Sequence, residues 1–377
     1  MIESDTVHDK RLKVAIAMLT LVPGTMGGGE TYARGLVRSI PSRPRIDATA
    51  YVGRQAKGFA TAIPEVVCEE IDGQGSTSGK IVTLLRGLLN RGRLRRTMQE
   101  ADVFHFPFAV ALPQPEADKA VVQTVFDMQH YDLPHLFSRA ERVYRRLFYE
   151  RTSRSADAII TISDFAKQTI VDHLGIPAEK IFTAYLAVDS SDFTPNLGPR
   201  EDFILYPARG WAHKNHATLF DAMRLLEKSH PGLKLVLTGG GLESLENIPG
   251  NVEVRGQVPL AELRELYQTA SCLVFPSLYE GFGFPPLEAM ASGCPVACST
   301  SGSLPEVVGD AAVLFDPHSP EAIAQAVLDA RSRADELRAL GFEQVKKFTW
   351  DACAKSHENA YAYAASARDR RLASSHS

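Results

Sequence analysis

Short apolar runs alternate with longer amphipathic runs along almost the whole chain, and this alternation constrains the fold more than any other feature. Val14–Leu19 is uninterrupted apolar sequence, whereas Glu30–Ser39 after it mixes apolar and charged residues at helical spacing. Strands of a parallel sheet are buried on both faces and therefore read as continuous apolar runs, with helices between them. The sequence predicts an α/β fold of doubly wound parallel sheets.

Two such series follow one another. Strands of the first series are expected at Val14–Leu19, Ala48–Val52, Val103–Phe106, Val121–Phe126, Ala158–Ile162 and Ile181–Ala184. Strands of the second are expected at Phe203–Pro207, Lys234–Thr238, Val252–Val254, Cys272–Phe275, Pro295–Ser299 and Ala312–Phe315. Helices are expected at Glu30–Ser39, Gly79–Gln99, Ser138–Ser155, Asp164–Leu174, Asn215–Lys228, Leu260–Thr269, Leu287–Ser292 and Pro320–Arg331.

A chain of 377 residues is too long for one compact core and suits two domains. We expect a first Rossmann-like domain over residues 1–190 and a second over 201–350, joined by the polar linker Ser190–Glu201. A terminal helix over 351–367 is expected to cross back to the first domain, before a disordered tail over 368–377. Two such domains place a ligand in the cleft between the carboxyl ends of their strands.

Charge and cysteine usage exclude several classes of protein. The formal net charge of -4 argues against a general nucleic-acid binder. The five cysteines show no CxxC pair, no zinc spacing and no disulfide framework, which fits a reducing cytosol. No apolar stretch approaches the about 18 residues of a membrane span, and the polar start does not resemble a secretory signal.

Two carboxylates bracket a glycine turn in the second series. Glu280 and Glu288 lie on either side of Gly281-Phe-Gly283, between an apolar run and a helical run. A strand-loop-helix joint presents backbone N–H groups that favour an anion, while carboxylates accept hydrogen bonds from hydroxyls. A ligand with both phosphate and hydroxyls, such as a nucleotide sugar, would satisfy both. An acidic loop facing water is the alternative.

Two further loops could contact an anionic ligand. Three contiguous glycines, Gly27–Gly29, directly precede the first helix and allow close approach of a ligand, although a flexible turn fits equally. Arg209 and Lys214 share one loop after the first strand of the second series, as a diphosphate site would require. A solvated basic loop is the alternative. His213 and His216 lie nearby without further metal ligands, so no metal site is expected.

Asp127 and His130 follow a strand of the first series. They are candidates for sugar hydroxyl contacts or proton transfer, and cap or turn residues are the alternative.

The stretch Lys80–Arg96 interleaves basic and apolar residues. It favours a helix packed on its sheet with a solvated basic face. Peripheral association with an anionic membrane is the alternative, which a lipid-linked acceptor would favour.

These motifs resemble the retaining glycosyltransferases of glycosyltransferase family 4, which have the GT-B architecture of two Rossmann-like domains. The Glu280-x7-Glu288 pair is the most specific element of the resemblance. The other matching segments are Gly27–Glu30, Ile159–Ser163, Ala289–Val296, Ser303–Ala312 and the Arg209/Lys214 loop.

The resemblance implies a role for each matching residue. Glu280 would contact the donor hexose and Glu288 the ribose. The diphosphate would be held by Arg209, Lys214, Gly28, Gly29, Gly281, Phe282, Gly283 and Phe284, and the nucleobase by Arg255, Gln257 and Val258. Many relatives carry His before the aspartate that matches Asp127, where this chain has Phe126. Either His130 compensates, or the backbone makes that sugar contact.

Together these features predict a cytosolic, retaining, metal-independent glycosyltransferase of polysaccharide biosynthesis, with no cofactor because the nucleotide sugar is a substrate. The acceptor would be the hydroxyl of a saccharide, a lipid-linked or a small molecule. GDP-mannose is favoured over a UDP-hexose, because Asp127–Ser138 resembles mannosyl-transferring members. The alternatives are an epimerase or sugar phosphorylase of the same fold, a non-catalytic nucleotide-sugar sensor, and a nicotinamide-dependent oxidoreductase, which the missing G-x-G-x-x-G disfavours.

Overall fold

The computed structural model describes residues 11–72, 77–108, 110–189 and 192–375 and contains two parallel sheets. The strands of the first sheet are β1 (Leu12–Met18), β2 (Ile46–Gly53), β3 (Glu65–Cys68), β4 (Val103–Phe106), β5 (Ala120–Thr124), β6 (Ala158–Thr161) and β7 (Ile181–Thr183). The strands of the second are β8 (Glu201–Pro207), β9 (Lys234–Thr238), β10 (Val252–Gly256), β11 (Ala270–Phe275), β12 (Val296–Ser299) and β13 (Val313–Phe315).

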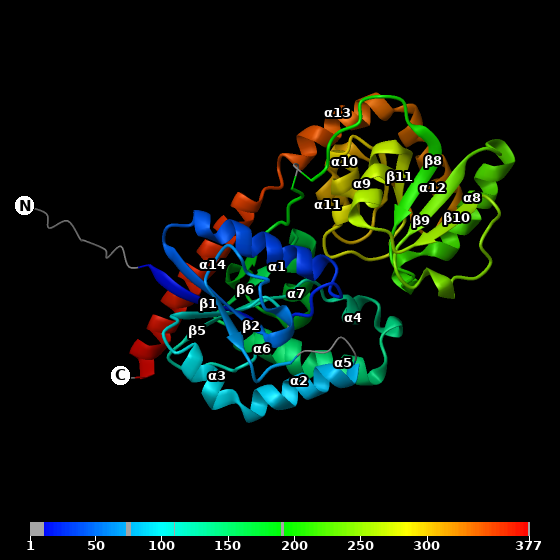
Figure 1. The fold of residues 1–377 in the computed structure, drawn as a ribbon. Helices are drawn as coiled ribbons and strands as arrows, with labels where there is room; N and C mark the ends of the chain where they lie inside the picture. Colours follow the sequence, from blue (N-terminus) through cyan, green and yellow to red (C-terminus); the bar gives the residue numbers. More distant parts are fainter. Residues whose placement is uncertain (1–10, 73–76, 109, 190–191, 376–377) are drawn as a thin grey trace, which may run out of the picture.

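Both sheets are doubly wound. The first has the order β3-β2-β1-β4-β5-β6-β7 and the second β10-β9-β8-β11-β12-β13, and every neighbouring pair is parallel. In each sheet the strand order reverses at one point, between β1 and β4 in the first sheet and between β8 and β11 in the second. Such a reversal leaves a crevice at the carboxyl ends of the strands. Figure 1 shows the two sheets in two separate lobes. The predicted α/β fold is confirmed.

Helices cover the sheets, largely where the amphipathic runs predict them. They are α1 (Gly28–Ser39), α2 (Thr77–Leu89), α3 (Arg91–Thr97), α4 (Gln129–Asp132), α5 (Arg139–Arg145), α6 (Arg151–Ser155), α7 (Asp164–Leu174), α8 (His216–Ser229), α9 (Leu260–Thr269), α10 (Phe284–Ala291), α11 (Leu304–Val308), α12 (Pro320–Ser332), α13 (Ala334–Val345) and α14 (Trp350–Ser375). A π-helical turn, η4 (Arg146–Glu150), joins α5 to α6. The single helix expected over Gly79–Gln99 is two helices, interrupted at Asn90.

Local signals set the ends of α7. The Ser163 hydroxyl accepts a hydrogen bond from Ala166 N over 3.0 Å, which satisfies one of the N–H groups left unpaired at a helix start. Gly175 ends the helix in the left-handed conformation, at φ 61°. Both ends follow from residue chemistry alone.

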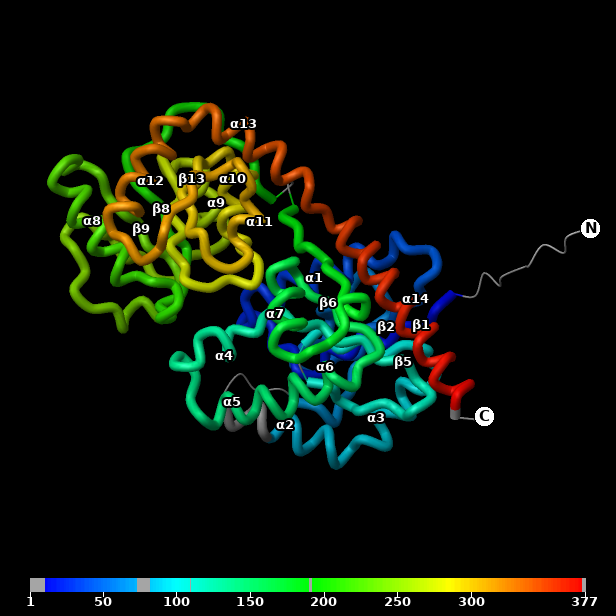
Figure 2. Tube along the Cα trace, turned by 180° about the vertical axis from the view of Figure 1, so that it is seen from behind, coloured from blue at the N-terminus to red at the C-terminus, as the bar shows by residue number. Residues whose placement is uncertain are grey.

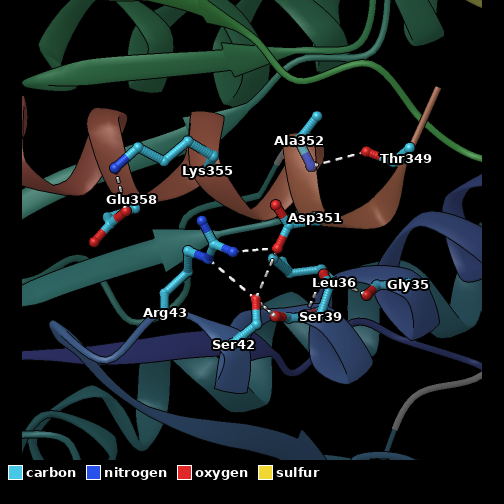
Figure 3. Close-up of polar contacts among 10 residues, drawn as sticks. All are labelled: Gly35, Leu36, Ser39, Ser42, Arg43, Thr349, Asp351, Ala352, Lys355 and Glu358. Atoms are coloured by element: carbon cyan, nitrogen blue, oxygen red, sulfur yellow. Dashed lines mark hydrogen bonds and ion pairs between the residues drawn. The ribbon is translucent and has the colours of Figure 1, made fainter. Parts of the chain in front are cut away.

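The terminal helix α14 belongs spatially to the first lobe. It leaves the second lobe after α13 and runs along the first sheet, where it packs on α1, β5, β6 and β7 (Figures 1 and 2). Figure 3 shows that its first turn contacts the segment after α1. Arg43 forms an ion pair with Asp351, and Ser42 Oγ lies 3.4 Å from the same carboxylate oxygen. This contact joins the last helix to the segment that follows the first.

A buried polar network continues the attachment inside the first lobe. Tyr32 on α1 shares hydrogen bonds of 2.8 Å with Thr124 on β5 and with His357 on α14. His105 on β4 bonds Thr124 over 2.9 Å and Tyr361 over 2.9 Å. All five side chains are fully buried. Burial lowers the pKa of His357 to about 4, so this ring is neutral near pH 7.

Residues 368–375, expected in a disordered tail, instead continue α14. Arg371 forms an ion pair with Asp157 and donates to Ala117 O over 3.0 Å, and Arg368 donates to Asp102 O over 3.2 Å. These contacts anchor the last turns on the first sheet, which the polar composition did not indicate. Within the described part of the chain, no helix has the length and apolar character needed to traverse a bilayer.

Candidate active site

The loops after β8 and β11 meet at the carboxyl edge of the second sheet, because these strands are neighbours. The first loop carries Lys214 and the second carries Glu280. Lys214 Nζ donates to Glu280 Oε1 over 2.5 Å, and the two side chains are only 13% and 14% exposed. An ion pair so well shielded from water holds both groups in a fixed orientation. The structure thus brings together two residues that the sequence predicts for the site.

The start of α11 fixes the backbone of the glycine turn. Ser303 N donates to Glu280 O over 3.1 Å, and the buried Ser303 hydroxyl lies 2.7 Å from Phe282 O. Pro285 and Pro286, in the first turn of α10, have no N–H group. The N–H donors at this helix start therefore come from the predicted turn Gly281–Phe284.

The two lobes touch at Gly281. Ser163 Oγ, from the start of α7, donates to Gly281 O over 2.7 Å. A Cβ atom built on Gly281 would lie 2.7 Å from Phe126 O, closer than real Cβ contacts allow. Glycine is therefore required here by the close approach of the first lobe.

Glu306 makes a second contact between the lobes. Its carboxylate accepts hydrogen bonds from Asp164 N over 3.0 Å and Phe165 N over 3.1 Å, both in the first turn of α7. Burial raises the pKa of Glu306, and these two hydrogen bonds oppose that rise. The Phe165 and Tyr279 rings pack edge to face beside it, with centroids 5.4 Å apart. Sequence reasoning assigned Glu306 no role, because its partners lie in the other lobe.

The glycine loop of the first lobe faces the second. A Cβ atom on Gly27 would lie 3.9 Å from Arg209 Nη2, and one on Gly28 would lie 3.6 Å from the Phe284 ring. The Arg209 guanidinium stacks on Trp211, with its carbon 5.1 Å from the ring centroid. Gly29 lies next to Phe126, within 3.9 Å of a built Cβ atom. Glycine loop, arginine and glycine turn therefore occupy one region between the lobes.

Asp127 lies at the same contact. Its Cβ atom is 3.6 Å from a Cβ built on Gly281, and its Oδ1 lies 3.8 Å from Arg145 Nη1. Oδ1 also accepts a bond from Gln129 N over 3.1 Å, as expected of a turn residue. The sugar-binding and the turn interpretations of Asp127 are therefore compatible.

His213 is a candidate that the sequence reasoning considered only as a metal ligand. Burial lowers its pKa, the adjacent Lys214 charge lowers it further, and Glu280 and Asp127 oppose the change. The imidazole is therefore neutral near pH 7, and Glu280 of the second lobe and Asp127 of the first both act on it electrostatically. Its position directly before Lys214 was the only sequence signal.

His130 is buried, and its contacts come from the first lobe. Its Nε2 lies 3.7 Å from Glu150 Oε1, and its ring packs against Tyr131 and Phe137. Neither ring nitrogen has a hydrogen-bond partner. Burial lowers the pKa of His130, with the Arg145 charge adding to the effect. None of these contacts is with Lys214 or Glu280.

Glu288 lines a cavity of about 380 Å³ between the lobes. Tyr267 donates to its Oε2 over 2.7 Å, and burial raises the pKa of the carboxyl group. The basic side chains of Arg34, Arg38 and Arg264 line the same cavity. Asp189 and Asp192 line it too, and a mixture of carboxylates and guanidinium groups suits a ligand with both hydroxyls and negative charge.

Arg255, Gln257 and Val258 lie at the end of β10 and in the turn after it. Arg255 is held by two carboxylates, with Nε 2.7 Å from Glu253 and Nη1 3.5 Å from Glu262. It lines a separate cavity of about 830 Å³ with residues from the starts of β8 and β9. Arg255 therefore does not line the cavity that contains Glu288. Among the described residues, no group of three or more His, Cys, Asp or Glu side chains could hold a metal ion.

Models of two families match the chain in succession. Glycosyltransferase Family 4 matches residues 26–192, and Glycosyl transferases group 1 matches residues 189–342.

Similar proteins include O-antigen chain mannosyltransferase B from Escherichia coli, 31% identical over 340 residues that make up 80% of this chain and 88% of that protein. O-antigen chain mannosyltransferase RfbU from Salmonella typhimurium is 28% identical over 57% of this chain and 62% of its own length.

Solved structures share the architecture. A sucrose-phosphate synthase from Thermosynechococcus elongatus superposes with a TM-score of 0.71 at 20% identity, covering 97% of this chain and 100% of that one. Anabaena HepE in complex with UDP and glucose gives a TM-score of 0.66 at 17% identity, covering 93% and 99%. The two parallel-sheet lobes are the two domains of a GT-B fold. The chain belongs to the group 1 glycosyl transferases and glycosyltransferase family 4.

Proposed function

We propose that this protein is a retaining glycosyltransferase that moves a hexose from a nucleotide diphosphate sugar to an acceptor hydroxyl. The observation that carries the proposal is the shielded Lys214–Glu280 pair at the Gly281 turn, facing Arg209 and the Gly27–Gly29 loop. Cations and amide donors for a diphosphate thus adjoin a carboxylate for hydroxyls. GDP-mannose is the favoured donor, supported by the two similar mannosyltransferases, and a UDP-hexose comes next.

Each part of the donor has a partner in this arrangement. Arg209, Lys214 and the Gly281–Phe284 amides would hold the diphosphate, with Gly28 and Gly29 leaving room for it. Glu280 would accept hydrogen bonds from hexose hydroxyls. Glu288, oriented by Tyr267, would accept them from the ribose. Gln257 and Val258 remain the nucleobase candidates, whereas Arg255 is engaged by Glu253 and Glu262.

The transfer step breaks the bond between the anomeric carbon and the diphosphate oxygen. Negative charge then develops on the diphosphate, where Arg209, Lys214 and the turn amides stabilise it. The acceptor oxygen bonds to the anomeric carbon on the same face, and its proton passes to the departing diphosphate. The proposal needs no metal, cofactor or covalent nucleophile. We place the enzyme in the cytoplasm, in keeping with five buried cysteines without disulfides.

Binding of GDP, UDP and dTDP, with NAD as the control ligand, tests this proposal by calorimetry and thermal shift. We expect GDP or UDP to bind and NAD not to bind. Lys214→Ala should weaken diphosphate binding by about 10- to 100-fold, as expected for loss of a hydrogen bond to a charged group. Lys228→Ala, an exposed lysine on α8, is the matched control. Binding of NAD without any nucleoside diphosphate would refute the proposal.

A further inference from the structure

Helix α2 presents apolar side chains to solvent. Val82, Leu85, Leu88 and Leu89 are 40%, 55%, 56% and 85% exposed, whereas Leu84 is buried at 9%. The interpretation favoured by the sequence, a helix that buries its apolar face and solvates its basic one, is therefore wrong for these four residues. An exposed apolar cluster of this kind marks an interaction surface.

A second element of the same lobe has the same character. On α5 and η4, Val143 and Leu147 are 56% and 55% exposed and lie one helical turn apart. Arg139, Arg142 and Arg146 are exposed beside them. Both views show α2 and α5 along the same edge of the first lobe, away from the second sheet (Figures 1 and 2). We call these six apolar residues and their neighbouring arginines the basic-apolar edge.

The basic-apolar edge is positive on balance, although Arg86, Arg93 and Arg146 have carboxylate partners in Asp72, Glu70 and Glu150. Residues 77–97 contain Lys80, Arg86, Arg91, Arg93, Arg95 and Arg96 and no Asp or Glu. In α5 the one acid, Glu141, is used in the capping box with Ser138. Positive charge around exposed apolar side chains complements a surface that is anionic outside and apolar beneath.

We propose that the basic-apolar edge docks on an anionic phospholipid surface. Arginines would contact the phosphates, and Leu85, Leu89 and Leu147 would enter the headgroup–acyl boundary. A nucleic acid would also attract the arginines, but it gives no apolar phase for six large side chains. A lipid surface therefore accounts for both the arginines and the exposed apolar side chains.

Docking at this edge would bring the candidate site close to the bilayer. The α5 helix that exposes Val143 carries Arg145, whose Nη1 lies 3.8 Å from Asp127 at the contact with the Gly281 turn. One helix thus separates the lipid-facing side chains from the cleft. Resting on the proposed function, this arrangement favours an acceptor hydroxyl carried by a membrane-anchored lipid over a freely soluble acceptor.

Co-sedimentation with vesicles tests the docking and needs neither donor nor acceptor, so its outcome is independent of the proposed function. We expect sedimentation with vesicles that contain phosphatidylglycerol, weak binding to phosphatidylcholine alone, and release by salt. Leu85→Ser/Leu89→Ser should lower partitioning by about tenfold or more. Leu197→Ser/Leu340→Ser, which changes leucines 68% and 37% exposed elsewhere, should leave partitioning unchanged.

Circular dichroism would establish that each variant is folded. Arg142→Gln/Arg146→Gln should reduce the preference for anionic vesicles. Binding of wild type and the Leu85/Leu89 variant to the same extent would overturn the proposal. So would the absence of vesicle binding, or tight binding to an RNA oligonucleotide alone.

Discussion

The two walls of the cleft are built by different physical means. The second-domain wall, here Lys214, Glu280 and Glu288, consists of shielded charged groups fixed by an ion pair and a tyrosine hydrogen bond. The first-domain wall, here Gly27–Gly29 and Ser163, consists of backbone and small side chains that approach the other lobe closely. One wall offers chemical recognition and the other offers fit. Substitutions in the first kind should change chemistry, and substitutions in the second should change closure.

Of the substitutions that test this difference between the walls, Glu280→Gln should have the largest effect. We expect turnover to fall roughly 100-fold or more, because a neutral amide replaces the charged acceptor for hexose hydroxyls in a shielded site. Nucleoside diphosphate affinity should change little, because Lys214 remains. Initial rates and calorimetry measure the two quantities, with the exposed Glu243→Gln as control. An equal loss of GDP or UDP affinity would remove Glu280 from the sugar side of the site.

Gly281→Ala tests fit at the contact between the walls. Its new methyl group would lie 2.7 Å from Phe126 O, so the lobes must separate or strain. We expect a loss of about 1–3 kcal/mol in the free energy of unfolding, together with a larger radius of gyration in solution scattering. Gly250→Ala, where a Cβ atom meets nothing within 4 Å, is the control. An unchanged radius would show that closure does not depend on this contact.

Glu306→Ala removes the acceptor for two N–H groups of α7. Because side-chain caps of helix starts contribute about 1 kcal/mol, we expect a loss of about 1–2 kcal/mol, measured by denaturant unfolding. Exposed Glu179, on the turn before β7, provides the control substitution Glu179→Ala. Scattering should again report a more open pair of lobes. Equal stability of both variants would mean that the Glu306 contact does not contribute to the free energy of unfolding.

The smallest expected effect is a change in how stability depends on pH when Glu288 is replaced. Burial raises its folded-state pKa, so folding favours the protonated form, and its contribution to stability falls as pH rises from the unfolded pKa through the folded one. Glu288→Gln removes this dependence. Relative to wild type, the free energy of unfolding of this variant should therefore rise between pH 4 and pH 7. Unfolding titrations at both values check the sign, and a relative loss would contradict it.

Sequence patterns predicted most strands because their signals are local. Apolar runs located every strand of the second sheet, whereas β3 (Glu65–Cys68) was missed because it is short and only half-buried at the sheet edge. Helix α7 was predicted to the residue, since its cap and its glycine stop both lie in the sequence. Helix α13 was missed because its hydrophobic pattern is weak.

In the candidate site, too, some features could be predicted from the sequence and others could not. The Lys214 and Glu280 loops were predictable, because the carboxyl ends of adjacent parallel strands must meet. The bonds of Ser163 to Gly281 and of Glu306 to Asp164 were not, because these partners lie 118 and 142 positions apart. Nor could the sequence show that Glu150 adjoins His130, or that Glu253 and Glu262 hold Arg255.

The crossing of α14 has a consequence for the order in which the protein can mature. During translation the first lobe emerges before its covering helix, which follows the whole second lobe in the chain. Until then Tyr32 lacks His357, and His105 lacks Tyr361, so polar groups of the first lobe stay open to water. The second lobe has all its strands before α14 is made. The chain should therefore complete its later half first, and released chains truncated before residue 350 should have a stable second lobe and an unfinished first one.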